Sequence, residues 1–491
     1  MSSPQTEYDV IIIGAGLSAL QAARTIQQDQ PGSSILLLEA RDRVGGRAHT
    51  LTTTHVDVGC SMLHGYYQGN PGRKLLKELG IQVHIPQEGA KGLVYGDERP
   101  LTEAAANSLF SQSTQMAYQP NPDQTENGLS VASLLFPTLL RENNEVGEKL
   151  IAIARTGEIG AGIELEKTSA KWAGYEKGIG GTDAWPMGGY SQVVNKLATE
   201  YESHGGHLQL SQIVTSLTDD PRSKTVKLTT LSENSFTSRY VISTIPLSVL
   251  QKQPPTFSPP LSPSLQSAIS RTLVGNLEKI VLTYSSAWWP HSSTQHSYLL
   301  LPLSTASHPP SKSATAPAPK DLIDLFSRTS IPIINFNSSL SSSPHPTLLA
   351  YIGASSARHL SQYTPESIAS NLHSYLISRF SSEEIETPSL PIASHVTNWS
   401  TDPFSLGATS TPSTLTQSEN GEWSNPLDFV SLSRSEWEGR LGWAGEHTVL
   451  DNHGSVTGAL ESGEREGRRV GLKLEQDSSR GRDNLNKVRR D

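Results

Sequence analysis

One stretch near the N-terminus, residues 8–50, most constrains the fold of this 491-residue chain. It opens with a short apolar, β-branched run at residues 9–13, which predicts a buried strand. A glycine-rich turn follows, and then an amphipathic segment at residues 20–28 that predicts a helix. A second apolar run at residues 34–38 ends in Glu39 and predicts another strand. This order of elements indicates a βαβ unit.

The turn inside this unit carries the pattern G-x-G-x-x-A, formed by Gly14, Gly16 and Ala19. Gly14 permits a tight turn, and Gly16 lets backbone N–H groups approach a pyrophosphate at the helix N-terminus. Ala19 keeps the helix and the strand close together. Glu39 follows 20 residues after Ala19, where a carboxylate can accept hydrogen bonds from a ribose diol. The sequence therefore predicts a dinucleotide site rather than a purely structural turn.

The residues that follow the second strand narrow the choice of dinucleotide. Arg41, Gly46 and Arg47 lie in the run Glu-Ala-Arg-Asp-Arg-Val-Gly-Gly-Arg, which adds a second backbone approach to phosphate and fixed cations. This run resembles the flavin-containing amine oxidase family, with polyamine oxidases the most similar members. In that family the segment ending in Gly-Gly-Arg binds FAD rather than NAD. The resemblance extends over residues 9–472, apart from low-complexity inserts.

The resemblance implies further contacts with FAD along the chain. The segment at residues 441–463 is similar to the closing motif of the family, in which a helix N-terminus faces the flavin and stabilises the charge of its reduced form. Other family positions line the flavin ring, the adenine or the ribityl chain. The implied cofactor-binding residues outside the N-terminal motif are Leu63, Val214, Trp399, Glu446, Ser455 and Val456.

Two residues are candidates for a direct part in the chemistry. Lys279 stands in an apolar strand, where polyamine oxidases carry a lysine that holds a water against flavin N5; a solvent-facing strand lysine is the alternative. His64 falls where several polyamine oxidases keep a histidine at the mouth of the catalytic tunnel, and a structural histidine fits equally well. Four acidic residues are weaker candidates for holding distant ammonium groups, with plain surface charge as the alternative: Glu164, Glu166, Glu176 and Asp183.

Several positions depart from the family pattern. Ala408 stands about where monoamine oxidases carry a flavin-linked cysteine, so FAD is expected to be noncovalent. Thr409 lies near the place of a usual aromatic residue, and Thr457 stands where many relatives have histidine. Ser455 replaces a tyrosine of plant polyamine oxidases. The substrate pocket is therefore altered, although the FAD motifs are complete.

The resemblance implies an α/β fold, that of a two-domain FAD oxidoreductase. The Rossmann-like FAD-binding domain is expected to be discontinuous and to comprise residues 1–80, 186–262 and 395–472. A substrate domain with a mixed sheet plus helices is expected from residues 81–185 and 263–394. Composition predicts a disordered low-complexity loop at residues 302–320 and a disordered charged tail at residues 473–491.

Charge and cysteine content narrow the functional class. Lys and Arg number 39 against 48 Asp and Glu, and the net charge of −9 argues against a nucleic-acid partner. The single cysteine, Cys60, excludes an internal disulfide and predicts a reducing compartment. No signal peptide or membrane-spanning apolar run is recognisable, so a soluble cytoplasmic protein without a membrane partner is expected.

The sequence thus predicts FAD-dependent oxidation of an amine C–N bond, with a small-molecule amine and O2 as substrates and no metal. A polyamine or N-acetylpolyamine is the first candidate, and aldehyde, amine and hydrogen peroxide are the expected products. Two alternatives stay open. One is a flavin oxidase or desaturase that acts on another amine in secondary metabolism, and the other is a flavoprotein fold kept as a non-catalytic scaffold.

Overall fold

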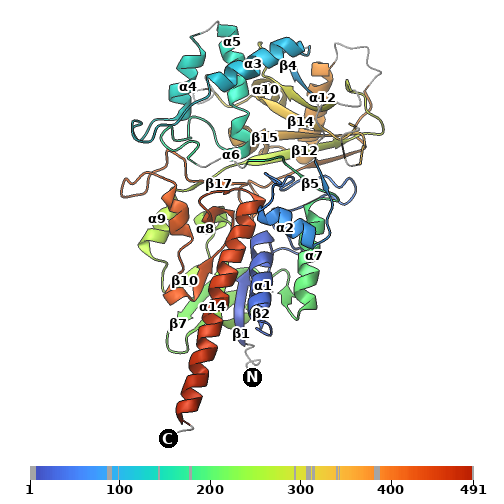
Figure 1. Ribbon diagram of the computed structural model, residues 1–491. Helices are drawn as coiled ribbons and strands as arrows, with labels where there is room; N and C mark the ends of the chain where they lie inside the picture. Colours follow the sequence, from blue (N-terminus) through green and yellow to red (C-terminus); the bar gives the residue numbers. More distant parts are fainter. Residues whose placement is uncertain are drawn as a thin grey trace.

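The computed structural model describes residues 7–85, 91–97, 99–141, 144–175, 180–291, 295–305, 311, 316–338, 341, 343–380 and 388–488. These residues form an α/β fold around two large sheets, which lie one above the other in Figure 1. Much of the predicted loop at residues 302–320 lies outside the described residues. None of the described helices combines the length and the apolar character needed to cross a bilayer.

The lower sheet has the order β10-β7-β8-β9-β1-β2-β6, and β18 also pairs with β9. Its strands are β1 (Glu7–Ile13), β2 (Ile35–Leu38), β6 (His207–Gln209), β7 (Val214–Asp220), β8 (Thr225–Thr230), β9 (Ser235–Ser243), β10 (Thr256–Ser258) and β18 (Leu441–Trp443). β1 pairs in parallel with both β2 and β9, which places Ile13, Leu38 and Ser243 side by side. The carboxyl ends of these strands therefore meet at one edge, where open α/β sheets bind their ligands.

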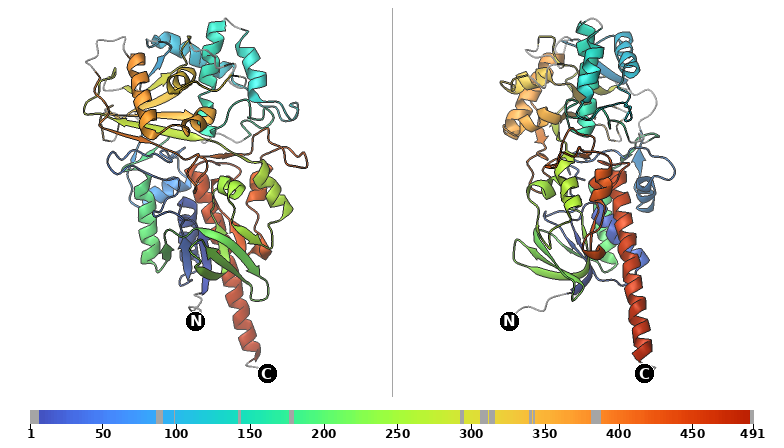
Figure 2. Two further views of the ribbon diagram at one scale, coloured as in Figure 1. Left: turned by 180° about the vertical axis from the view of Figure 1, so that it is seen from behind. Right: turned by 90° about the vertical axis from the view of Figure 1, so that its left-hand side faces the viewer.

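Two helices pack closely behind this edge. α1 (Leu17–Asp29) lies against α14 (Val456–Val488), the long helix that extends away from the body in Figures 1 and 2. Glycines on α14 allow the approach, since a Cβ on Gly463 would lie 2.3 Å from the Ser18 carbonyl oxygen. A Cβ on Gly467 would lie 2.7 Å from Thr25 Cβ. The close packing fixes the N-termini of both helices at the same edge of the sheet.

The charged tail predicted at residues 473–491 begins inside α14, which continues as one helix to Val488. Its disorder stays a prediction. The packed first half of α14 supplies the nucleus that an isolated charged segment lacks, and Glu, Lys, Arg and Leu propagate a helix well. Asp477 also ties the extension to β9, since Oδ2 accepts hydrogen bonds from Arg239 Nη2 at 2.5 Å and from Tyr240 Oη at 2.8 Å. The last three residues lie outside the described part of the chain.

The upper sheet has the order β16-β12-β15-β14-β13-β4 and is mixed, as predicted. Only β13 and β4 pair in parallel, whereas the other neighbours are antiparallel. Its strands are β4 (Lys91–Tyr95), β12 (Leu277–Thr283), β13 (Gln295–Leu300), β14 (Ile331–Asn335), β15 (Thr347–Gly353) and β16 (Ala393–Val396). Buried aromatic side chains such as Phe326 and Tyr375 fill the core between this sheet and its helices.

The remaining elements complete both halves. Helices beside the upper sheet are α3 (Glu103–Gln115), α4 (Val131–Leu139), α5 (Asn144–Ala154), α6 (Gly157–Ala161), α10 (Leu322–Arg328), α11 (Ala354–Leu360) and α12 (Pro365–Phe380). Those beside the lower sheet are α2 (Pro71–Glu78), α7 (Tyr190–Ser203), α8 (Leu247–Lys252), α9 (Pro263–Arg271), α13 (Leu427–Leu432), η2 (Trp437–Gly439) and η3 (Glu446–Thr448). Two short ribbons pair β3 (Val83–His84) with β5 (Trp185–Pro186) and β11 (Leu273–Val274) with β17 (Ser410–Thr411).

The predicted domain limits stay predictions, and the packing qualifies one of them. α9 begins just after the predicted limit at residue 262, yet its Leu265 and Ala268 belong to the core of the lower sheet. The polypeptide therefore crosses to the upper sheet after α9, near the ribbon formed by β11 and β17.

Candidate functional site

The main cavity has a volume of about 500 Å³ and is lined by residues of both sheets. Its lining runs from Ile13 and Leu38, at the carboxyl ends of β1 and β2, to Lys279 and Tyr351 on β12 and β15. Thirteen of the fifteen sequence-predicted site residues line this cavity: Gly14, Gly16, Glu39, Arg41, Gly46, Arg47, His64, Val214, Lys279, Trp399, Glu446, Ser455 and Val456.

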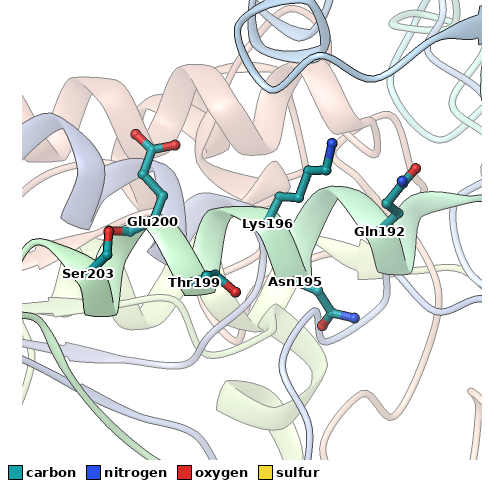
Figure 3. A pocket seen from close by; sticks show the side chains of 6 residues that line it. All are labelled: Gln192, Asn195, Lys196, Thr199, Glu200 and Ser203. Atoms are coloured by element: carbon teal, nitrogen blue, oxygen red, sulfur yellow. The ribbon is translucent and has the colours of Figure 1, made fainter.

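A second hollow, shown in Figure 3, lies along the outer face of α7. Side chains of this single helix line it, from Gln192 to Ser203, and most of them are exposed. Its Lys196 donates a hydrogen bond to the Leu79 carbonyl oxygen, and its Glu200 pairs with Arg24. These contacts are those of a polar helix surface, so the hollow is not a candidate site.

The glycine turn has the geometry that the motif predicts. Gly14 has φ +106°, and a Cβ there would lie 2.3 Å from Thr244 Oγ1, so only glycine fits. Gly16 is the N-cap of α1 and provides no side-chain hydrogen bond. A Cβ on Gly16 would come no nearer to another residue than 3.9 Å, from Gly45 O, so its absence leaves open space beside the helix N-terminus. Exposed N–H groups at such a terminus suit a pyrophosphate.

Glu39 lies in the cavity wall at the end of β2. Its Oε2 accepts a hydrogen bond from Ala15 N at 2.7 Å, and its Oε1 accepts one from Arg41 N at 2.8 Å. Burial raises the pKa of the carboxyl, and the two backbone donors oppose that shift. The carboxylate is thus oriented by the turn itself, in the position expected of a ribose acceptor.

The structure changes the interpretation of Arg41 as a free cation for phosphate. Its guanidinium donates two hydrogen bonds to Asp402, at 2.8 and 2.7 Å, and a third to Ser405 Oγ at 2.8 Å. Arg41 lines the cavity, but its charge is already paired. Its contacts hold the loop that follows Trp399 against the lower sheet.

Arg43 is a residue that sequence reasoning missed. Its guanidinium donates to the carbonyl oxygens of Val44 and Gly46, at 3.1 and 3.0 Å, and so shapes the glycine loop. Burial and the neighbouring Arg41 lower its pKa. Its place between Glu39 and the glycine pair was the available signal.

Arg47 and Glu446, which the resemblance implies separately as FAD-binding residues, contact each other and so join distant parts of the sequence. Arg47 Nη1 lies 2.9 Å from Glu446 Oε1 and also donates to the Ala408 carbonyl oxygen. Glu446 accepts further hydrogen bonds from Ser410 Oγ at 2.9 Å and from Gly454 N at 3.1 Å. Burial opposes ionisation of Glu446, yet Arg47 and the Ser410 hydroxyl outweigh it and hold the pKa below its usual value. The buried carboxylate is therefore charged.

Lys279 does not face solvent, which removes the alternative considered from sequence. The residue is 3% exposed, and its Nζ donates to Asp57 O at 2.9 Å and to Gly59 O at 2.7 Å. Ser61 Oγ lies 3.4 Å from the same nitrogen. The centroid of the Tyr351 ring is 5.2 Å away, within range of a cation–π contact. An ammonium group is thus held at the cavity wall by main-chain carbonyls.

The carbonyls that hold Lys279 are themselves fixed by Asp57. Its Oδ1 accepts hydrogen bonds from Thr50 Oγ1 at 2.5 Å and from Tyr190 N at 2.9 Å. Burial raises the pKa of Asp57 to about 6, against the effect of these hydrogen bonds and of Lys279. The Asp57 side chain therefore anchors the segment that carries two acceptors for the lysine.

Trp399 contacts the same segment, between the two carbonyls that hold Lys279. Its Nε1 donates to Val58 O at 3.0 Å, and its backbone N donates to Glu278 Oε2 at 3.0 Å. Glu278 also accepts hydrogen bonds from Ser400. Adjacent residues of β12 thus serve opposite faces, since Lys279 points to the cavity and Glu278 holds the loop.

His64 lies at the edge of the cavity, and its side chain is 46% exposed. Its Nδ1 is 3.0 Å from Asp183 Oδ2, so one of the four weaker acidic candidates is its partner. Glu164 pairs with Arg358, and Glu166 pairs with Arg155. Neither of these two lines the cavity, and Glu176 lies outside the described residues.

Two predicted cofactor residues, Ala19 and Leu63, do not line the cavity. Both are fully buried in the core of the lower half. Ala19 faces the sheet, which is the packing role assigned to it. Leu63 exchanges backbone hydrogen bonds with Ala184, and its side chain occupies the space beside Gly72.

The positions that depart from the family pattern do not all line the cavity. Ala408 and Thr409 line the cavity, whereas Thr457 is buried behind it and accepts a hydrogen bond from Asn70 Nδ2 at 3.3 Å. Cys60 also lines the cavity, but burial raises the pKa of its thiol and disfavours the nucleophilic thiolate. Ala408 offers no thiol, so the lining favours a noncovalently held flavin.

The lower sheet, the glycine turn and the cavity beneath the upper sheet define a dinucleotide-binding protein of the oxidoreductase class. A family model described as "Flavin containing amine oxidoreductase" matches residues 15–471, and the chain belongs to that family. FAD is therefore its cofactor. The space at Gly16 and the uncapped start of α1 fit such a group.

Several curated proteins are similar to this chain. Polyamine oxidase 2 of Arabidopsis thaliana is 28% identical over 57% of this chain, and the match spans 59% of that relative's length. Amine oxidase [flavin-containing] B of Sus scrofa is 24% identical over 95% of this chain and 86% of its own length. Among solved structures, cyclohexylamine oxidase from Brevibacterium oxydans IH-35A covers 96% of this chain and 100% of its own, with a TM-score of 0.67 and 19% identity. That likeness concerns the fold.

Proposed function

We propose that this chain catalyses FAD-dependent oxidation of a small-molecule amine, with O2 as the second substrate and hydrogen peroxide as a product. The observation that carries the proposal is the single cavity that connects the dinucleotide turn at Gly14 with Lys279 and His64. FAD, when bound, supplies the two-electron acceptor for a C–H bond next to nitrogen. The scaffold alternative has less support because the cavity continues past the cofactor motifs to the upper sheet.

Different residues of this chain would bind different parts of FAD and the substrate. Gly14, Gly16 and the start of α1 would hold the pyrophosphate, and Glu39 would accept hydrogen bonds from a ribose. Arg47 and Glu446 would hold the opposite end, where the α14 N-terminus favours developing negative charge. Upper-sheet side chains would exclude water and orient the amine.

Lys279 would contribute a fixed positive charge beside the reacting end of the cavity. Its two short hydrogen bonds to carbonyl oxygens keep the ammonium in place, and its third donor direction lies toward Ser61 Oγ. A positioned cation of this kind stabilises negative charge that develops when O2 is reduced.

A polyamine or N-acetylpolyamine is one candidate substrate, supported by the similarity to plant polyamine oxidases and by Asp183, which contacts the lining residue His64. A second candidate is an amine with one nitrogen and an apolar skeleton. Among the described lining residues the carboxylates are Glu39 and Glu446, and both are already hydrogen-bonded to this chain. The lining therefore gives less support to a substrate with several ammonium groups.

Peroxide release is the direct test. The FAD-loaded protein would be incubated with spermine, spermidine, N1-acetylspermine, benzylamine and n-butylamine, and peroxide would be measured with a coupled peroxidase. Anaerobic bleaching of the flavin absorbance by the same amines separates reduction from reoxidation. If none of a broad amine panel bleaches the flavin, the proposed function is wrong and the scaffold alternative gains support.

A further inference from the structure

Tyr351 and Lys279 form a directly opposed pair on neighbouring antiparallel strands. Residues of β12 and β15 face each other in register, and Lys279 lies opposite Tyr351. Side chains of such a pair project from the same face of the sheet. Both line the cavity, and the lysine Nζ lies 5.2 Å from the centroid of the tyrosine ring.

The other aromatic residues of the described lining belong to the cofactor end. Trp399 is fixed by its hydrogen bond to Val58 O, and its ring centroid lies 6.0 Å from Arg41 Cζ. The Phe404 ring lies 5.4 Å from the same atom. Tyr351 is the lining aromatic that comes from the upper sheet, among the residues that the structure describes.

Tyr351 packs against a buried cluster formed by Val56, Val58, Val281 and Leu349. Ile159 and Gly160 of α6 line the cavity, together with Thr409 and Ser455. Thr409 Oγ1 donates to the carbonyl oxygens of α6, at 3.3 Å to Gly160 and 3.2 Å to Ala161, so its polar atom is engaged. At the upper-sheet end of the described lining, Tyr351 therefore offers an apolar skeleton the one aromatic ring that this sheet contributes.

We propose that Tyr351 is a specificity-determining residue, whose ring is the platform for the carbon skeleton of the amine. This inference rests on the proposed function and deepens it by naming a substrate class: amines with a flat or cyclic apolar skeleton. Ring-to-ring contact adds favourable energy beyond simple burial. The nearby Lys279 ammonium repels a second cation at the same place, so a linear polycation gains less from this surface.

The test compares Tyr351→Leu, which removes the ring, with Tyr351→Phe, which keeps it. Tyr363→Leu is the matched control, because Tyr363 is also half-buried in the upper half but does not line the cavity. KM is measured for benzylamine and n-butylamine. Calorimetry gives the Kd of 2-phenylpropan-2-amine, which has no hydrogen on the carbon next to nitrogen and cannot be oxidised there.

Tyr351→Leu is expected to raise the benzylamine KM and the Kd of the probe by roughly 3- to 10-fold, the range of an aromatic pair. The n-butylamine KM, the flavin content and the values for Tyr351→Phe and Tyr363→Leu should change less than about twofold. Equal effects on both amines, or no effect on the probe, overturn the inference. If Tyr351→Leu does not fold, Tyr351→Met replaces it.

The two hypotheses fail in different ways. A wild-type protein that oxidises amines but shows no dependence on the Tyr351 ring contradicts only the specificity role. A wild-type protein whose flavin no amine reduces contradicts the proposed function, and the Kd of the probe still decides whether the ring forms a binding platform. Spermine as the best substrate, with a KM unchanged in Tyr351→Leu, also overturns the inference.

Discussion

Replacement of Lys279 by methionine tests the centre of the site most sharply. Methionine keeps the length of the side chain but removes the donors that now reach Asp57 O at 2.9 Å and Gly59 O at 2.7 Å. Each buried acceptor left without a partner costs about 1–3 kcal/mol. The free energy of unfolding should therefore fall by roughly 2–6 kcal/mol if both carbonyls stay dry.

Urea unfolding of the FAD-loaded protein measures this loss, with Lys227→Met on β8 as a control. Lys227 is exposed, so its replacement should change the free energy of unfolding by less than about 0.5 kcal/mol. Unchanged stability in Lys279→Met would show that the ammonium is not tied to the two carbonyls, and the geometric argument would then fail.

The same variant separates the two half-reactions. Anaerobic reduction by a good amine should stay within about threefold of wild type, since amine oxidation needs positioning more than a fixed cation. Reoxidation by O2 in a stopped-flow mixing experiment should slow by roughly 100-fold, the cost of losing a preorganised electrostatic donor. Equal reoxidation rates would refute the role of Lys279 and leave the FAD site untouched.

Three further predictions concern the cofactor end and its support. Gly14→Ala should lose FAD, seen as a colourless protein, whereas Gly32→Ala, also at positive φ but with no atom within 4 Å of its Cβ, should keep it. The pKa of Asp57 is raised from 3.8 to about 6, so the folded state binds its proton more tightly and loses this stabilisation as the pH rises from 3.8 to 6. Relative to Asp57→Asn, the free energy of unfolding of the wild type should fall by about 3 kcal/mol over that rise, measured by urea unfolding at each pH. A difference between the two proteins that does not change with pH contradicts this prediction. Arg41→Met should leave Asp402 without its partner and raise the Kd for FAD about 10-fold in flavin-release assays. If Asp402→Asn leaves the Kd for FAD unaltered, the positioning role of the Arg41–Asp402 pair is contradicted.

The local part of the site was accessible from sequence because its physics is local. The turn at Gly14 and Gly16 needs only its own strand, helix and backbone geometry, and the acid at Glu39 follows within the same βαβ unit. The mixed character of the upper sheet and the fold class are likewise confirmed. Family resemblance supplied Arg47 and Glu446 as cofactor residues one by one, and the structure adds the contact between them across 399 positions.

The missed features depend on long-range partners that no local pattern contains. From its own segment Arg41 is interpreted as a cation for phosphate, but in the structure it pairs with Asp402, 361 positions away. The Lys279 donors are taken by carbonyls that lie more than 200 positions away, and a carbonyl leaves no signature in a sequence. The helical start of the charged tail was missed for a related reason, since the contacts of Asp477 with β9 are tertiary.

The pairing of the cavity arginines bears on how FAD is held. Arg41 is neutralised by Asp402 and Arg47 by Glu446, so neither offers its full charge to a pyrophosphate. The unneutralised attraction at the glycine turn then comes from the N–H groups at the start of α1. The field of a helix terminus acts over about one turn, and salt screens it less than it screens the charge of a surface cation. FAD retention should therefore depend weakly on salt. Flavin release that rises steeply between 0.05 and 0.5 M NaCl would assign the pyrophosphate to the arginines instead.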